Sequence, residues 1–285
     1  MAELLRGAPV AKAMAGALRP RAGALRARGV APALALVRVG EREDDISYER
    51  GAMKRCEQCG VEARRILLPG DAAQETLIET LRSLSADRSV HGILLFRPLP
   101  ERMDDAAVCA AIAPDKDVDG VTAASMAALY AGAGEDRDRI FAPCTAEACV
   151  ALLKHYGVEL RGKRVTVVGR SLVIGKPAAM LLLAEDASVT VAHSKSENLA
   201  ALCRDADVLV AAAGKAGLIG AEHIRAGQTV VDVGIHVLPD GTLCGDVRAP
   251  EAEPIARALT PVPGGVGAVT TAVLCKHVIE AASRW

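Results

Sequence analysis

The chain has 285 residues, with 34 basic and 35 acidic side chains and a formal net charge of −1. This balance excludes the strongly basic surface of a protein that binds nucleic acid or an anionic membrane. No apolar run is long and uncharged enough for a transmembrane helix, and the N-terminal segment lacks the features of a signal peptide. Apolar residues make up 51% of the chain, which is enough for the cores of two modest domains.

The eight cysteines predict a reduced, cytoplasmic protein rather than a disulfide-bonded one, because several lie in apolar surroundings. Cys56 and Cys59 have the spacing of half a metal site or of a redox pair. No second pair follows at ligand spacing, so we expect no metal site.

In the first half, short β-branched runs alternate with helical stretches, which predicts an α/β fold with largely parallel sheets. One helix is expected to begin at Asp44 or Asp45 and to end at Cys59, with Gly60 just beyond its end. The other helices are predicted at about 9–28, 74–84 and 104–112, and the strands at 33–39, 63–68 and 92–96.

The second half repeats this alternation from about residue 143. We therefore predict an N-terminal domain over 1–140 and a Rossmann-type dinucleotide-binding domain over 141–268, with a final helix at about 269–285 packing back onto the first. Within the second domain, helices are predicted at 146–156 and from the turn after Val168 to Leu183, and strands at 164–168, 188–192, 207–212 and 229–233.

A glycine-containing turn follows the predicted strand 164–168 and leads into a helix. Glycine lets the backbone approach a pyrophosphate, and the helix N-terminus offers free N–H groups. The turn lacks the GxGxxG pattern, so an ordinary connection between strand and helix is the alternative. The candidate cofactor-binding residues here are Gly169, Arg170, Ser171, Gly175, Lys176 and Pro177.

The next strand indicates which dinucleotide is bound. NAD sites usually place an acidic residue at its end, but this strand runs into His193, Ser194 and Lys195. Arg170 and Ser194 could instead contact a 2′-phosphate, which favours NADP. Glu197 lies close by and keeps NAD possible.

The motifs SYERGAMK, GILLFRPLP, PDKDVDG, GRSLVIGKP, TVAHSKS, VVDVGIHV and TPVPGGVG follow one another along the chain. In order and spacing they resemble bifunctional methylenetetrahydrofolate dehydrogenase/cyclohydrolases over essentially the whole sequence. The resemblance implies an N-terminal α/β domain that holds folate, a Rossmann-type domain that binds NADP, a cleft between them, and a homodimer. It also implies hydride transfer from 5,10-methylenetetrahydrofolate to NADP, followed by hydrolysis of the methenyl product to 10-formyltetrahydrofolate.

The resemblance also assigns roles to residues. Tyr48 and Asp119 match catalytic and substrate-binding positions, and Asp119 would hold the pterin ring. The remaining matches are Pro263, Gly264 and Gly265 for the substrate, and His193, Ser194 and Ile235 for the cofactor.

Three positions depart from the family pattern. The family's lysine, four residues after the tyrosine, is Ala52 here, and its glutamine is Phe96. A serine of the family is replaced by Asp45, which could partly compensate as a base. Lys54 should point away from Tyr48, because two residues turn a helix by about 200°. Arg97 should face away from Phe96, because side chains alternate along a strand.

The lysine and glutamine serve hydrolysis in the family, whereas hydride transfer mainly needs positioning. We therefore expect an NADP-dependent methylenetetrahydrofolate dehydrogenase whose cyclohydrolase activity is weak or lost. The alternatives are a fully bifunctional enzyme and a non-catalytic homologue that binds folate or nucleotide.

Overall fold

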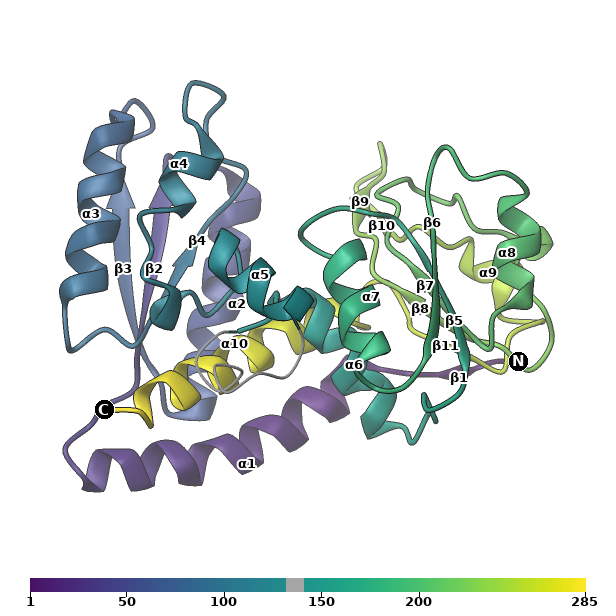
Figure 1. The fold of residues 1–285 in the computed structure, drawn as a ribbon, viewed down its shortest axis with the longest axis horizontal. Coiled ribbons are helices and arrows are strands. Elements are labelled where there is room, and N and C mark those ends of the chain that lie inside the picture. Colours follow the sequence, from purple (N-terminus) through teal and green to yellow (C-terminus); the bar gives the residue numbers. More distant parts are fainter. Residues whose placement is uncertain (132–140) are drawn as a thin grey trace. The chain divides into compact units, whose positions relative to one another are not determined.

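A computed structural model describes residues 1–131 and 141–285. The chain forms two compact units, each built from two stretches of sequence (Figure 1). The first unit comprises Met1–Ala11 and Thr145–Thr270, and the second comprises Lys12–Cys144 and Thr271–Trp285. Among the described residues, no helix is both long and apolar enough to cross a membrane.

The first unit contains a parallel six-stranded sheet in the order β1-β11-β8-β7-β5-β6. Its central strands are fully buried runs of β-branched and other apolar residues, as expected for a parallel sheet covered on both faces. The strands are β1 (Glu3–Leu4), β5 (Arg164–Val168), β6 (Ser188–Ala192), β7 (Val208–Ala211), β8 (Thr229–Asp232) and β11 (Ala258–Leu259). The hairpin β9 (His236–Val237) and β10 (Leu243–Cys244) and the helices α6 (Cys144–His155), α7 (Gly175–Leu183), α8 (Leu199–Asp205) and α9 (Ala249–Ala252) complete it.

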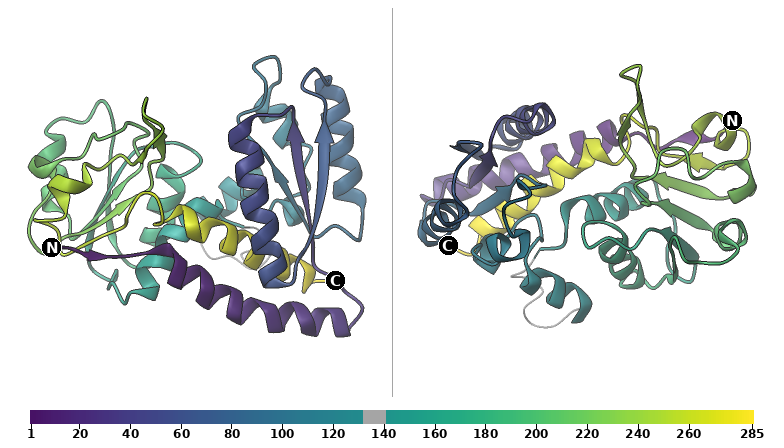
Figure 2. Two further views of the ribbon diagram at one scale, coloured as in Figure 1. Left: turned by 180° about the vertical axis from the view of Figure 1, so that it is seen from behind. Right: turned by 90° about the horizontal axis from the view of Figure 1, so that it is seen from above.

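The second unit contains a parallel three-stranded sheet in the order β3-β2-β4. All seven residues of the central strand β2 are buried. The strands are β2 (Ala33–Val39), β3 (Glu62–Leu68) and β4 (Gly92–Leu95). The helices are α1 (Gly7–Ala27), α2 (Glu43–Cys59), α3 (Gln74–Ala86), α4 (Asp105–Cys109), α5 (Ala123–Ala131) and α10 (Gly267–Ala282). Within this unit α1 and α10 lie side by side (Figure 2), joined by an ion pair between Arg21 and Glu280.

The predicted α/β class is confirmed, but the start of α2 differs from the prediction. The helix begins at Glu43 with Arg42 at the N-cap, so neither Asp44 nor Asp45 caps it. Both aspartates lie in the first turn, where a carboxylate interacts favourably with the helix dipole. The C-terminal end follows the prediction, with Gly60 in the left-handed region at φ 78°.

A buried ion cluster holds α2 against the sheet of the second unit. The Glu49 carboxylate lies 3.3 Å from Nε of Arg38 in β2 and 2.6 Å from Nε of Arg65 in β3. The side chains of Glu49 and Arg38 are only 2% and 4% exposed. The cluster therefore sets which face of α2 turns toward the strands.

Glu49→Ala should lower the free energy of unfolding by about 3–5 kcal/mol, because it leaves the buried Arg38 without its counter-ion. Urea unfolding followed by circular dichroism measures this loss. Glu57→Ala, on an exposed position of the same helix, is the control and should change stability by less than about 0.5 kcal/mol. Equal effects of the two substitutions would contradict a stabilising role for the cluster.

Candidate active site

One face of α2 carries the candidate folate residues. Tyr48 lies beside Phe96, with ring centroids 6.0 Å apart and ring planes at 81°. Ala52, one turn further along, is buried. The two positions that depart most from the family pattern therefore flank the same tyrosine.

Tyr48 combines an accessible ring with a desolvated hydroxyl. The residue is 38% exposed. Burial and the negative charge of Asp119 raise the pKa of the Tyr48 phenol well above its usual value. Tyr48 is therefore neutral near pH 7, and can donate a hydrogen bond or stack against a planar ring.

Asp119 is a desolvated carboxylate whose charge acts on Tyr48. Burial raises its pKa to about 6, although a hydrogen bond with the Cys144 thiol opposes this rise. Its neighbour Asp117 is engaged, because it accepts hydrogen bonds from the amides of Val121 and Thr122 and from the Ser125 hydroxyl. Asp117 therefore stabilises the loop that also carries Asp119.

Arg97 acts on this site, which strand alternation did not predict. Strand β4 ends at Leu95, so the alternation does not extend to Arg97. Its guanidinium donates to Asp105 at 2.8 Å, and its positive charge lowers the pKa of Asp119. The site therefore contains a cation, but at a position different from that of the family's lysine.

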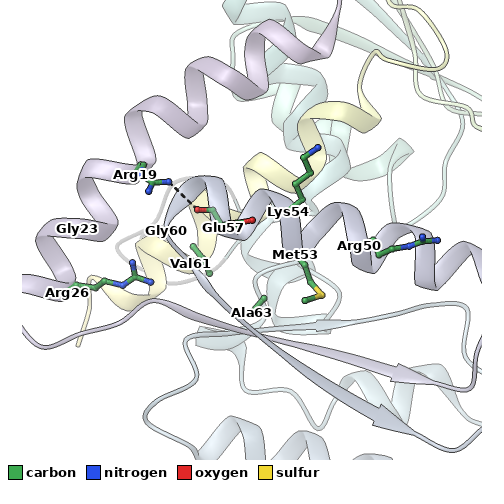
Figure 3. Close-up of a pocket in the computed structure, with 10 residues that line it drawn as sticks. All are labelled: Arg19, Gly23, Arg26, Arg50, Met53, Lys54, Glu57, Gly60, Val61 and Ala63. Carbon is green, nitrogen blue, oxygen red and sulfur yellow. Dashed lines mark hydrogen bonds between the residues drawn. The ribbon is translucent and has the colours of Figure 1, made fainter.

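Lys54 lies on another face of α2, as the helical rotation predicts. It is exposed and lines a pocket of about 770 Å³ beside α1 and β3 (Figure 3). The lining consists of Arg19, Gly23, Arg26, Arg50, Met53, Lys54, Glu57, Gly60, Val61 and Ala63, and includes neither Tyr48 nor Asp119. Lys54 does not replace the missing lysine at the tyrosine.

The turn after β5 is built for close backbone approach. Gly169 has φ 134°, and a Cβ there would overlap the Ala212 carbonyl. A Cβ on Gly175 would overlap the backbone of Gly169 itself. The turn therefore needs both glycines, and it brings the N-terminus of α7 to the end of β5, which fits a pyrophosphate.

The other predicted residues of this turn divide into exposed and structural positions. Arg170 and Lys176 are exposed, whereas Pro177 is buried in the first turn of α7. The Ser171 hydroxyl accepts from the amide of Ile174 at 3.2 Å, so it stabilises the turn.

Arg170 and Ser194 follow neighbouring strands, since β5 pairs with β6 in register. Both are exposed at the carboxyl edge of the sheet, where a Rossmann fold binds its cofactor. His193 is a turn residue, because its Nδ1 accepts from the amide of Lys195 at 3.2 Å. Ile235, after β8, is 62% exposed and therefore accessible to a ligand.

Two buried aspartates organise this edge and were not identified from the sequence. Asp232, at the end of β8, accepts from the amides of Gly234, Asp246 and Val247 at 2.9–3.0 Å. Asp246 in turn accepts from three successive amides, Ala213 to Lys215, and contacts Nε2 of His236 at 2.7 Å. The signal was present, since each aspartate stands between apolar residues in VVDVGI and GDV.

The candidate substrate segment 263–265 forms a turn in the first unit. Gly264 has φ 99°, and its carbonyl accepts from the amide of Gly7 at 2.8 Å. Pro263 and Gly264 are exposed, whereas Gly265 is buried against the Pro261 carbonyl. The first two can therefore meet a ligand, and Gly265 allows the tight turn.

Comparison with known proteins covers both units. Residues 5–119 match the family model of the tetrahydrofolate dehydrogenase/cyclohydrolase catalytic domain, and residues 143–285 match that of its NAD(P)-binding domain. The Bifunctional protein FolD of Carboxydothermus hydrogenoformans is 46% identical over 99% of this chain and 97% of its own length.

Solved structures agree with the sequence comparison. The bifunctional FolD enzyme of Campylobacter jejuni superimposes with a TM-score of 0.95 at 33% identity, covering 100% of this chain and 99% of the other. The Trypanosoma brucei methylenetetrahydrofolate dehydrogenase-cyclohydrolase, solved with NADP and an inhibitor, gives 0.92 at 36% identity, covering 99% and 98%. The resemblance is confirmed: the chain belongs to the tetrahydrofolate dehydrogenase/cyclohydrolase family.

Proposed function

We propose that this chain oxidises 5,10-methylenetetrahydrofolate with NADP and then hydrolyses the methenyl product to 10-formyltetrahydrofolate. The observation that carries the proposal is the pair formed by Tyr48 and Asp119, a neutral phenol with a half-buried carboxylate close enough to raise its pKa. A carboxylate of this kind can accept two adjacent N–H groups from a pterin, and the phenol ring offers a flat apolar face.

The nucleotide half of the proposal rests on the Gly169–Gly175 turn and the exposed Arg170. The two glycines let this turn pack against the Ala212 carbonyl and against itself, which brings the free amides at the N-terminus of α7 to the end of β5, where a pyrophosphate can accept their hydrogen bonds. Bound NADP would accept the hydride from the methylene carbon of the folate. The residues of this turn would hold the NADP. The solved structures from Campylobacter jejuni and Trypanosoma brucei are named as methylenetetrahydrofolate dehydrogenase/cyclohydrolases, and the one from Trypanosoma brucei was solved with NADP.

Loss of hydrolysis, expected from Ala52 and Phe96, is not supported by the comparisons. Relatives at 46% and 44% identity over almost the whole chain are named as bifunctional proteins, which favours the fully bifunctional alternative. A dehydrogenase with slow hydrolysis is the second candidate, because Ala52 and Phe96 offer no hydrogen-bond donor or acceptor. The homodimer and the cytoplasmic location stay predictions.

Purified enzyme supplied with methylenetetrahydrofolate and NADP should convert the methenyl product to 10-formyltetrahydrofolate at a rate comparable with NADPH formation. Absorbance of the methenyl chromophore and of NADPH, recorded together, measures both steps. Lasting accumulation of the methenyl product would favour the second candidate. In that case Ala52→Lys combined with Phe96→Gln should restore hydrolysis, and either change alone should do less.

Arg170→Ala should raise the KM for NADP roughly 10- to 100-fold, the effect of losing a charged hydrogen bond to the 2′-phosphate. The KM for NAD, which has no such phosphate, should change little. Arg161→Ala, an exposed arginine before β5 at the opposite edge of the sheet, is the control and should leave both values unchanged. Equal effects of Arg170→Ala on NADP and NAD would show that the phosphate is not bound there.

Asp119→Asn should abolish folate turnover while NADP binding persists, and it should also raise the Tm above pH 6. The pKa of Asp119 is about 6 in the folded protein, so the folded state binds this proton more tightly than the unfolded chain does. The free energy of unfolding of the unsubstituted protein therefore falls as the pH rises from about 4 to about 6. Asparagine carries no titrating proton, so the variant does not lose this stability. Thermal unfolding at pH 5 and pH 8 tests the sign, and a lower Tm at pH 8 would contradict it.

A further inference from the structure

We propose that Asp45 is the general base of the hydrolytic step, taking the proton from the water that attacks the methenyl carbon. In this chain it would replace the lysine that the family carries at the position of Ala52. The inference rests on the proposed function, because it concerns the second of the two reactions.

Asp45, Tyr48 and Ala52 point in nearly the same direction from α2. Each residue turns an α-helix by about 100° about its axis. Viewed down the axis, Ala52 therefore lies between the other two residues, about 40° from Tyr48 and about 20° from Asp45. Asp45 and Ala52 both belong to the buried face of the helix. Helical side chains tilt toward the N-terminus, so a lysine at position 52 would extend toward the turn that carries Asp45.

Contacts on both sides of Asp45 place it at the corner formed by Phe96. Tyr48 packs edge-on against Phe96, and Nη1 of Arg42 donates to the Pro98 carbonyl at 2.9 Å. Asp45 stands between these two residues of α2, and its carboxylate lies 3.8 Å from Nε of Arg42. The carboxylate is therefore placed beside the segment that follows Phe96, and it lies about 10 Å along the helix axis from Ala52, the direction in which a lysine there would extend.

The Asp45 carboxylate is available to a water molecule. Its 3.8 Å contact with Arg42 is longer than a hydrogen bond, and no described residue donates a hydrogen bond to it. Its side chain keeps 9% of its surface exposed. Burial raises the pKa of Asp45, with a smaller rise from Asp44, while the charges of Arg42 and Arg38 oppose it. Asp45 is therefore a stronger base than an exposed aspartate.

The other carboxylates and the phenol of this region are less suited to the role. Glu49 is held by two arginines, at 2.6 and 3.3 Å. Tyr48 is neutral, because its pKa lies well above the usual value. Asp119 hydrogen-bonds with Cys144 and is assigned to the pterin in the proposed function. Asp45 alone among these groups combines burial with free acceptor capacity.

The chemistry balances with Asp45 as the base. The water oxygen bonds to the methenyl carbon, and one water proton moves to the Asp45 carboxylate, which gives a neutral hydroxyl adduct. The bond from this carbon to N5 then breaks, and its electron pair stays on N5, which receives a proton. The hydroxyl of the adduct loses its proton to form the formyl group on N10, so one proton is released overall.

Asp45→Asn tests this assignment, because asparagine keeps the shape and removes the base. We expect methenyltetrahydrofolate hydrolysis to fall by about 100-fold or more relative to NADPH formation by the same preparation. Asp45→Glu, which keeps a carboxylate, should retain more hydrolysis than Asp45→Asn. Glu43→Gln is the matched control, an exposed carboxylate in the same helical turn, and should leave the ratio of the two rates unchanged.

The other outcomes separate this inference from the proposed function. Hydrolysis by Asp45→Asn at the wild-type ratio would overturn the role of Asp45 and leave the bifunctional assignment intact. An equal loss of both reactions would show that Asp45 is only structural. A wild-type enzyme that forms NADPH without hydrolysing the methenyl product would overturn the second reaction and the inference together.

Discussion

The buried Glu49 carboxylate is the constraint on which the candidate folate site depends. It pairs with one arginine from β2 and one from β3, and such a cluster tolerates little rotation of the helix that carries it. With Glu49 fixed toward the strands, Asp45, Tyr48 and Ala52 share the buried side of α2 or its border, and Lys54 points to solvent. The loss of the family's lysine is therefore not repaired by its nearest neighbour in sequence.

The nucleotide unit uses buried carboxylates in the same way. Asp246 accepts amides from the segment that follows β7, and Asp232 accepts amides from the segments that follow β8 and β10, so each fixes loops at this edge of the sheet. Burial raises the pKa of Asp232 to about 6 despite its amide partners. In this unit the desolvated Asp232 carboxylate thus costs stability near neutral pH and sets the shape of a binding surface.

The local pattern of the sequence predicted most of the fold and part of the candidate site. The strand patterns predicted the bounds of β2, β5 and β6 to the residue. β2 and β5 are buried and read as nearly continuous apolar runs, whereas β6 is a mostly exposed edge strand rich in β-branched residues. The two-residue strands β1 and β11 were missed, since they exist only through pairing between distant segments. The hydrogen bond between Asp119 and Cys144, and the charge of Arg97 acting on Asp119, depend on tertiary folding and have no local signature.

The central claim is that one active site carries methylenetetrahydrofolate through both reactions without the family's lysine. A single-turnover experiment tests it most directly, with enzyme in excess over methylenetetrahydrofolate, saturating NADP, and the methenyl absorbance followed in time. The account predicts that this absorbance rises with NADPH formation and then decays to 10-formyltetrahydrofolate faster than in a mixture without enzyme. A rise to a plateau that decays only at the enzyme-free rate would contradict it.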